Sequence, residues 1–201
     1  MEHRYDKYWE HEGYKIIDCM DCGFKHVYPV PEKESMKEFY DEKYYSEIKP
    51  FYYKNVTEDF ILRKSEEVDN NKIYGAIYDK VGEYKRAYEN VMVDIGSGND
   101  LLALYFQNKE WEVCVVEPNV KAAEYLNSYN LNVINDYMEN IQPEILKGSS
   151  FINVQFVLEH IHNSAAFLEK AYGMLVPGGI IRICVPNDFS EGQMAFKEYH
   201  S

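Results

Sequence analysis

The second half of the sequence predicts an α/β protein built on a doubly wound parallel sheet. From about Asn90 onward, short and continuously apolar segments alternate with segments of roughly ten residues that have helical periodicity, the pattern of a parallel sheet with helices on both faces. The first apolar segment ends in an acid and then turns through two glycines, in VMVDIGSGND at 91–100. Because ligands bind at the carboxyl ends of such strands, this turn is expected to border a ligand site.

Each element of this sheet has its own segment of sequence. The apolar runs predict strands at 91–95, 112–117, 131–135, 151–157 and 179–186, and the segments between them predict helices at 100–109, 120–130 and 164–175. A helical extension precedes the sheet, because apolar residues such as Ile77, Val81 and Tyr84 recur at intervals of three or four within 56–89. This extension is one long helix or two helices broken around Asp69-Asn70-Asn71.

Composition limits the classes of function. The 201 residues fit one ordinary domain with a small appendage, and a hydrophobic content of 46% argues against disorder. A formal charge of −13 disfavours a basic surface for nucleic acid. No run of about 18 apolar residues is present to span a membrane, and no secretory signal is recognisable at the start. Four cysteines without a dense disulfide pattern suggest a reducing cytoplasm.

Acids gather at the predicted ligand edge. Asp94 ends the first strand, Asp100 begins the following helix, Glu117 ends the second strand, and Asp136 follows the third. An acid that ends the second strand can accept hydrogen bonds from both hydroxyls of a ribose, and Glu117 follows Gly96 by about the 20 residues expected for that role. The edge is therefore expected to bind an adenosyl ligand.

The charges at this edge distinguish between two kinds of adenosyl ligand, a dinucleotide and S-adenosylmethionine. The glycine run places Leu101 where a dinucleotide-binding turn has its third glycine. A pyrophosphate prefers a helix N-terminus without negative side chains, so Asp100 disfavours a dinucleotide. S-adenosylmethionine has no phosphate and carries a cationic sulfonium and ammonium, which suit a group of carboxylates. Asp100 is also well placed to cap its helix.

Five segments in order resemble class I S-adenosylmethionine-dependent methyltransferases, in particular the branch similar to ubiquinone-biosynthesis O-methyltransferases. These segments are VMVDIGSG, VCVVEPN, NVINDYMEN, FVLEHIHN and MLVPGGIIRICVPN. The resemblance implies a Rossmann-like sheet of strand order 3-2-1-4-5, with the final antiparallel hairpin missing or truncated, within a cofactor-binding domain at 56–201. It also implies methyl transfer to a small-molecule acceptor, with oxygen the favoured atom, by a monomer or homodimer.

The same resemblance implies roles for individual residues. Glu117 would hold the ribose with Pro118 beside it, and the adenine would lie between Asp136 and Tyr137. The methionine portion would lie against Gly96, Ser97 and Gly98, with Gln155 under its methionine end. Asp94 is a further cofactor-binding candidate. His160 is the candidate general base, although a buried structural role is an equal alternative. The Pro177-Gly178-Gly179 turn would redirect the chain into the fifth strand.

The first 55 residues carry two further features. Cys19-x2-Cys22 is half of a zinc-knuckle pattern; tetrahedral zinc needs four ligands, and His3, His11 and His26 are the available substitutes for a second cysteine pair. A degenerate ribbon with two free thiols is favoured over a zinc site. No catalytic metal is expected either, because Phe156 replaces the acid that some members of the resembling family use.

The second feature is a tyrosine-rich run at 39–53 that resembles the segment lying over the cofactor in this family. Tyr45 is the candidate whose ring covers the sulfonium, since an aromatic face attracts a cation. Packing against the sheet edge is the alternative role for most of the run.

Two further functions stay open. A non-catalytic domain that binds S-adenosylmethionine or supports assembly is the main alternative, and a nicotinamide-dependent oxidoreductase is disfavoured by Asp100. The chain ends soon after the fifth strand, which favours a fragment of a longer protein.

Overall fold

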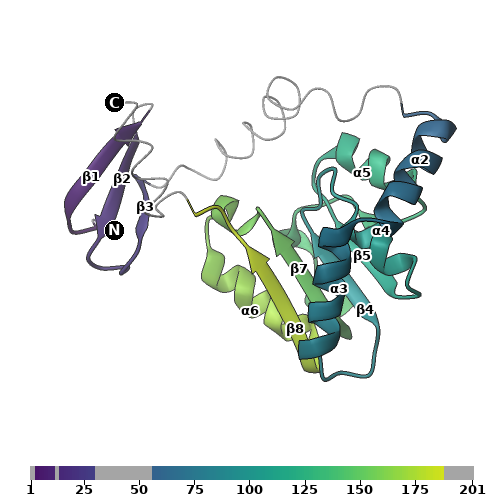
Figure 1. Ribbon diagram of the computed structural model, residues 1–201. Helices are drawn as coiled ribbons and strands as arrows, with labels where there is room; N and C mark the ends of the chain where they lie inside the picture. The colour runs from purple at the N-terminus through teal and green to yellow at the C-terminus, as the bar shows by residue number, and fades with distance from the viewer. Residues whose placement is uncertain (1–2, 12–13, 30–55, 188–201) are drawn as a thin grey trace. The chain divides into compact units, whose positions relative to one another are not determined.

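A computed structural model describes residues 3–11, 14–29 and 56–187. The chain forms two compact units, which we call unit 1 (Met1–Lys49) and unit 2 (Pro50–Ser201). Figure 1 shows the described elements of both units. Each unit is considered by itself below.

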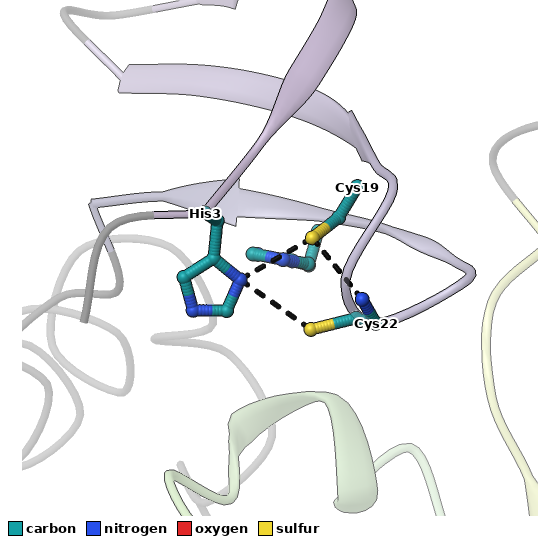
Figure 2. A group of neighbouring side chains, drawn as sticks. His3, Cys19 and Cys22 are labelled. Carbon is teal, nitrogen blue, oxygen red and sulfur yellow. Dashed lines mark hydrogen bonds between the residues drawn. The ribbon is translucent and has the colours of Figure 1, made fainter.

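Unit 1 contains a three-stranded antiparallel sheet of order β1-β2-β3. The strands are β1 (Tyr5–His11), β2 (Tyr14–Cys19) and β3 (Lys25–Tyr28). The Cys-x2-Cys segment forms the turn between β2 and β3, so the two cysteines lie at one end of the sheet, where His3 also approaches them (Figure 2). The sequence analysis did not predict these strands, whose apolar residues are interrupted by charged ones.

Unit 2 contains a five-stranded parallel sheet of order β6-β5-β4-β7-β8. The strands are β4 (Val91–Ile95), β5 (Glu112–Val116), β6 (Asn132–Ile134), β7 (Ser149–Gln155) and β8 (Leu175–Cys184). This arrangement confirms the predicted α/β class and the order 3-2-1-4-5. β4 lies in the centre, so the glycine turn that follows it borders the point where strand order reverses.

The predicted helices are also present. They are α2 (Glu58–Asp69), α3 (Lys72–Tyr84), α4 (Leu102–Gln107), α5 (Val120–Asn127) and α6 (Ser164–Met174). The break between α2 and α3 falls at the predicted site because Asn71 caps α3: its side chain accepts hydrogen bonds from the N–H groups of Ile73 and Tyr74. The sequence did not predict the short 3-10 helices η2 (Met138–Asn140), η3 (Pro143–Ile145) and η4 (Leu158–His160).

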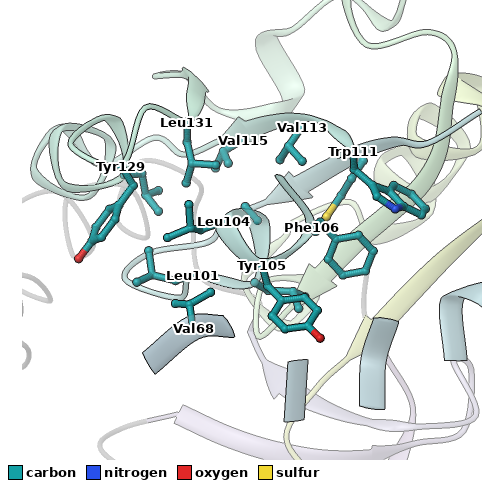
Figure 3. Close-up of a cluster of buried hydrophobic side chains, with 14 of the residues drawn as sticks. Val68, Leu101, Leu104, Tyr105, Phe106, Trp111, Val113, Val115, Tyr129 and Leu131 are labelled. Carbon is teal, nitrogen blue, oxygen red and sulfur yellow. The ribbon is translucent and has the colours of Figure 1, made fainter. Parts of the chain in front are cut away.

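Two apolar clusters cover the two faces of the sheet. The first joins α2, α3, α4 and α5 to Met92 of β4 and Phe151 of β7, and Figure 3 shows its central side chains. The rings of Phe106 and Phe151 lie 5.2 Å apart, and those of Phe106 and Trp111 lie 5.0 Å apart. The second cluster packs α6, η2 and η3 against the other face. Alternate residues of each central strand therefore pack against the helices on opposite faces of the sheet.

The Pro177-Gly178-Gly179 segment lies inside β8 at an irregularity of register with β7. Gly178 has a φ of +81°, and a Cβ there would approach the backbone N of Ala87 to 3.0 Å. Its carbonyl accepts hydrogen bonds from the N–H groups of Arg86 and Ala87. A glycine is thus required where β8 packs against the segment that leads into β4.

Among the described residues, no helix combines the length and apolar character needed to cross a bilayer. The expected cytoplasmic location and the expected monomer or homodimer stay predictions.

The sheet centre should dominate the stability of unit 2. Phe151 is fully buried between the aromatic rings of the first cluster, so Phe151→Ala should lower the free energy of unfolding by about 3–5 kcal/mol. Tyr172→Ala, at a position 79% exposed on α6, should change it by less than about 0.5 kcal/mol. Urea unfolding monitored by circular dichroism measures both, and equal losses would contradict this account of the core.

Candidate functional site

A row of polar side chains crosses the sheet at one register position. Asp94 of β4 pairs with Asn153 of β7, which pairs with Arg182 of β8. Asn153 donates to the Asp94 carboxylate at 2.7 Å and accepts from Arg182 at 2.7 Å. The Ser97 hydroxyl, from the glycine turn, donates to the other Asp94 oxygen. The row thus connects the turn after β4 to a cation two strands away.

Asp94 is 1% exposed. Burial raises the pKa of its carboxyl group to about 6 from the usual 3.8, although the hydrogen bonds from Ser97 and Asn153 oppose the shift. An acid kept inside a sheet at this cost indicates a role other than packing.

The glycine turn approaches the neighbouring strand end closely. The N–H of Gly96 donates to the carbonyl of Val116 at 2.7 Å. Gly96 has a φ of +69°, and a Cβ at this position would lie 2.5 Å from Cγ2 of Val157. A larger residue would require the Val157 side chain to move, so glycine lets the turn pack closely against the loop after β7.

Glu117 joins the turns that follow β4 and β5. It is 2% exposed, and its two carboxylate oxygens accept hydrogen bonds from the N–H groups of Gly98 at 2.8 Å and Asn119 at 2.9 Å. Burial raises its pKa, and both hydrogen bonds oppose that shift. Each carboxylate oxygen has a second acceptor position, so the group can still accept hydrogen bonds from a ligand.

Asp100 lies just before Leu101, which is the N-cap residue of α4, and not at the cap position that the sequence suggested. Its carboxylate accepts from the N–H of Leu102 at 2.9 Å and from the Gln155 amide at 3.3 Å. The Gln155 oxygen in turn accepts from Arg182 at 2.9 Å. The charge on Asp100 also raises the pKa of the Tyr74 hydroxyl, after the larger effect of burial. Gln155 is therefore joined to the glycine turn through Asp100.

Asp136 and Tyr137 follow β6 and are both partly buried. The Asp136 carboxylate accepts from the N–H of Tyr137 and from the Asn140 amide, both at 2.7 Å, which fixes the start of η2. The amide of Asn135 donates to the carbonyls of Glu117 and Pro118. These contacts connect the end of β6 to the end of β5.

His160 lies in η4, in the loop after β7. Its side chain is 39% exposed, its Nε2 lies 3.9 Å from a Glu159 carboxylate oxygen, and burial lowers its pKa. The loop begins with an unusual backbone, because Phe156 has a φ of +55°.

Several residues of this site escaped the sequence analysis. Asn153, Arg182, Asn135 and Asn119 connect the predicted residues to one another. A signal was available for two of them: Asn153 and Arg182 each stand between apolar residues in a strand, and a polar side chain there needs a partner. Tyr45, which was predicted to cover the sulfonium, lies outside the described residues.

Unit 1 contains the two free cysteines that the sequence analysis considered. The structure brings His3 and His26 together with Cys19 and Cys22, so the two thiols have two imidazoles beside them. Burial raises the pKa of Cys19, but hydrogen bonds from the N–H of Cys22 and from His3 outweigh it and lower the pKa to about 6. The side chain of His11, the third histidine considered, lies outside the described residues.

The pKa of Asp94 predicts a pH dependence of stability. Because its folded-state pKa lies above its unfolded value, the folded protein binds more protons between these values, and the free energy of unfolding falls as the pH rises through them. In the difference between wild type and Asp94→Asn, measured by urea unfolding from pH 3 to pH 8, this loss should amount to about 3 kcal/mol.

The matched control is Asp79→Asn, at an exposed position of α3, which should keep the wild-type pH dependence. Identical profiles for wild type and Asp94→Asn would show that burial does not raise the Asp94 pKa.

Comparison with solved structures places this fold among methyltransferases. The chain is similar to the plantazolicin methyltransferase BpumL, in complex with a pentazolic desmethylPZN analog and SAH, at 15% identity and a TM-score of 0.53, covering 83% of this chain and 67% of that chain. It is also similar to magnesium protoporphyrin IX methyltransferase (ChlM) from Synechocystis PCC 6803 with bound SAM, at 9% identity and a TM-score of 0.51, covering 74% of each chain. At these identities the likeness concerns the fold.

When this chain is compared with two other BpumL structures, it covers 55% and 60% of the BpumL chain. No curated protein matches the sequence. The family model described as "Methyltransferase domain" matches residues 66–201. Since that match covers more than half of the sequence, the chain belongs to the methyltransferase domain family.

Proposed function

We propose that unit 2 binds S-adenosylmethionine at the carboxyl ends of β4 and β5 and transfers its methyl group to an oxygen atom of a small-molecule acceptor. The observation that carries this proposal is the buried Glu117 carboxylate, which lies against the glycine turn and retains acceptor capacity. A ribose at this edge would donate both hydroxyls to Glu117, with Pro118 beside it.

The acidic residues at this edge suit S-adenosylmethionine chemically. Glu117, Asp94 and Asp100 are acids held at or near the strand ends, and a sulfonium ligand brings positive charge without phosphate. Asp136 and Tyr137, at the end of β6, are the candidates for the adenine. The pyrophosphate of a dinucleotide would instead meet the Asp100 carboxylate at the start of α4.

The methionine portion would lie along the glycine turn. Gly96 lets the turn pack closely against Val157, and Asp94 and Gln155 are held in place by Asn153 and Arg182. A cationic ammonium near Asp94 would offset the cost of its buried charge. The ordering of these side chains before a ligand arrives is the form of preorganisation that binding requires.

Methyl transfer requires few further functional groups from the chain. The cofactor supplies an electrophilic methyl group on a sulfonium, so the residues must align the acceptor, exclude water and remove a proton where the acceptor is a hydroxyl. His160 can take that proton at an imidazole nitrogen, and burial favours the neutral form that does so. The proposed acceptor is phenolic, in keeping with the resemblance to ubiquinone-biosynthesis O-methyltransferases.

The similar structures support the cofactor and leave the acceptor open. BpumL was crystallised with SAH and ChlM with SAM. BpumL is in complex with a pentazolic desmethylPZN analog, and ChlM is a magnesium protoporphyrin IX methyltransferase. These two compounds have little in common, so neither is carried over to this chain. Covering of the sulfonium by Tyr45 and of the site by 1–55 remains a prediction.

Glu117 gives the sharpest binding test. Glu117→Gln should weaken S-adenosylmethionine binding by about 1.5–3 kcal/mol, because a charge-assisted hydrogen bond to the ribose is lost. The matched control is Glu112→Gln, at the exposed start of the same strand, which should bind as the wild type does. Titration calorimetry with S-adenosylmethionine, its demethylated product and NAD measures all three proteins.

Binding of NAD in preference to the other two ligands would favour a nicotinamide-dependent oxidoreductase over a methyltransferase. An unchanged affinity in Glu117→Gln would remove the ribose assignment. Binding without turnover on a panel of phenolic and sugar acceptors would favour the non-catalytic domain.

His160 gives the test of catalysis. If it is the general base, His160→Ala should lower kcat by about 10²- to 10⁴-fold, with unchanged affinity for S-adenosylmethionine. Because burial lowers its pKa, the wild-type rate should fall only as the pH drops below the usual histidine value of 6.5. His162→Ala, at an exposed neighbouring position, is the control. A wild-type rate in His160→Ala would leave His160 with a structural role.

A further inference from the structure

We propose that unit 1 contains a structural zinc site, with His3, Cys19, Cys22 and His26 as its four ligands. The ligand atoms of these residues all lie within 4.8 Å of one another. The four residues lie before β1, at the end of β2, in the following turn and in β3, so one ion would join all three strands. This inference is independent of methyl transfer by unit 2.

The distances fit a tetrahedral ion. Nδ1 of His3 lies 3.2 Å from Sγ of Cys19 and 3.4 Å from Sγ of Cys22, as Figure 2 shows. Zinc bonds of about 2.3 Å to sulfur and 2.0–2.1 Å to nitrogen place N and S ligands about 3.5 Å apart in a tetrahedron. The imidazole and the two thiols therefore need only small adjustments around an ion.

His26 supplies an independent observation. Its Nε2 is buried and has no hydrogen-bond partner, the only such side-chain atom in the part of the chain that the structure describes. Its Nδ1 lies 2.9 Å from the carbonyl of Val27, so Nδ1 must carry the proton and Nε2 keeps its lone pair. A histidine that ligates a metal is commonly oriented in this way by a backbone carbonyl. Without an ion, this nitrogen would be desolvated at a cost.

The turn and the N-terminal segment hold the other ligands in position. The N–H of Cys22 lies 3.3 Å from Sγ of Cys19, an arrangement that stabilises a thiolate. Arg4 binds Asp21 through its backbone N–H and its guanidinium, and its carbonyl accepts from Met20. These bonds attach the residue after His3 to the turn between the two cysteines.

The small core of unit 1 explains why an ion would be needed. Among its described residues, Ile17 and Cys19 are the only buried apolar side chains. Domains of this size with so little buried surface usually need a metal, disulfides or a partner. A set of two thiolates and two imidazoles suits zinc, and four protein ligands leave no open position for catalysis. The role is therefore structural, and zinc binding would contribute directly to the folding free energy.

The test is the metal content of the full-length chain expressed with zinc and purified without chelator. Elemental analysis should find one zinc ion per chain. Replacing zinc with Co²⁺ should give the visible absorption of a tetrahedral site together with thiolate charge transfer. Cys22→Ser and His3→Ala should lose the ion, while Cys184→Ser and His162→Ala, both in unit 2, should retain it.

Two further measurements test the proposal even if the ligand variants misfold. His26→Cys should retain the ion, because cysteine is also a zinc ligand, and its Co²⁺ form should show stronger thiolate charge transfer than the wild type. Binding of S-adenosylmethionine reports separately on the folding of unit 2. A wild-type chain without stoichiometric zinc, or zinc content that is unchanged in both Cys22→Ser and His3→Ala, would overturn the proposal.

Discussion

A buried carboxylate sets the geometry of unit 2. Glu117 directly follows β5, and each of its oxygens accepts a hydrogen bond from a backbone N–H group, one in the glycine turn after β4 and one at Asn119, the N-cap of α5. An ionised carboxylate out of water is costly unless it is hydrogen-bonded, so these N–H groups must remain directed at it. The two turns that border the strand ends are thereby held together, and the position of any ligand at this edge follows from that constraint.

A second buried acid extends the constraint across the sheet. Asp94, Asn153 and Arg182 occupy one row of β4, β7 and β8, and Ser97 connects the row to the glycine turn. Burying Asp94 costs stability near neutral pH, and an apolar residue would suit a central strand better. Sequences depart from the rules of packing mainly where function requires it. Two acids buried at the same edge of one sheet are such a departure, and they favour a cationic ligand.

Much of the fold could be predicted because it depends on local patterns. Continuous apolar runs located all five strands of the parallel sheet, and Asp69-Asn70-Asn71 located the break between α2 and α3. The family was predicted from five ordered motifs, and the match over 66–201 confirms it as far as the methyltransferase domain. The predicted roles of Gly96, Glu117 and the other site residues remain untested, although the structure brings most of them to one edge. Asn153 and Arg182 were missed because their partners lie 59 and 29 residues away in sequence. The grouping of His3 with Cys19 and Cys22 likewise depends on the pairing of β1 with β2, which no local pattern reveals.

The most direct test of the central claim is a crystal structure of the chain with the demethylated cofactor product bound. The account predicts that the ligand lies beside the turn at Gly96, with both ribose hydroxyls within hydrogen-bond distance of the Glu117 carboxylate. A ligand bound at any other place, or a ribose that does not contact Glu117, would contradict it.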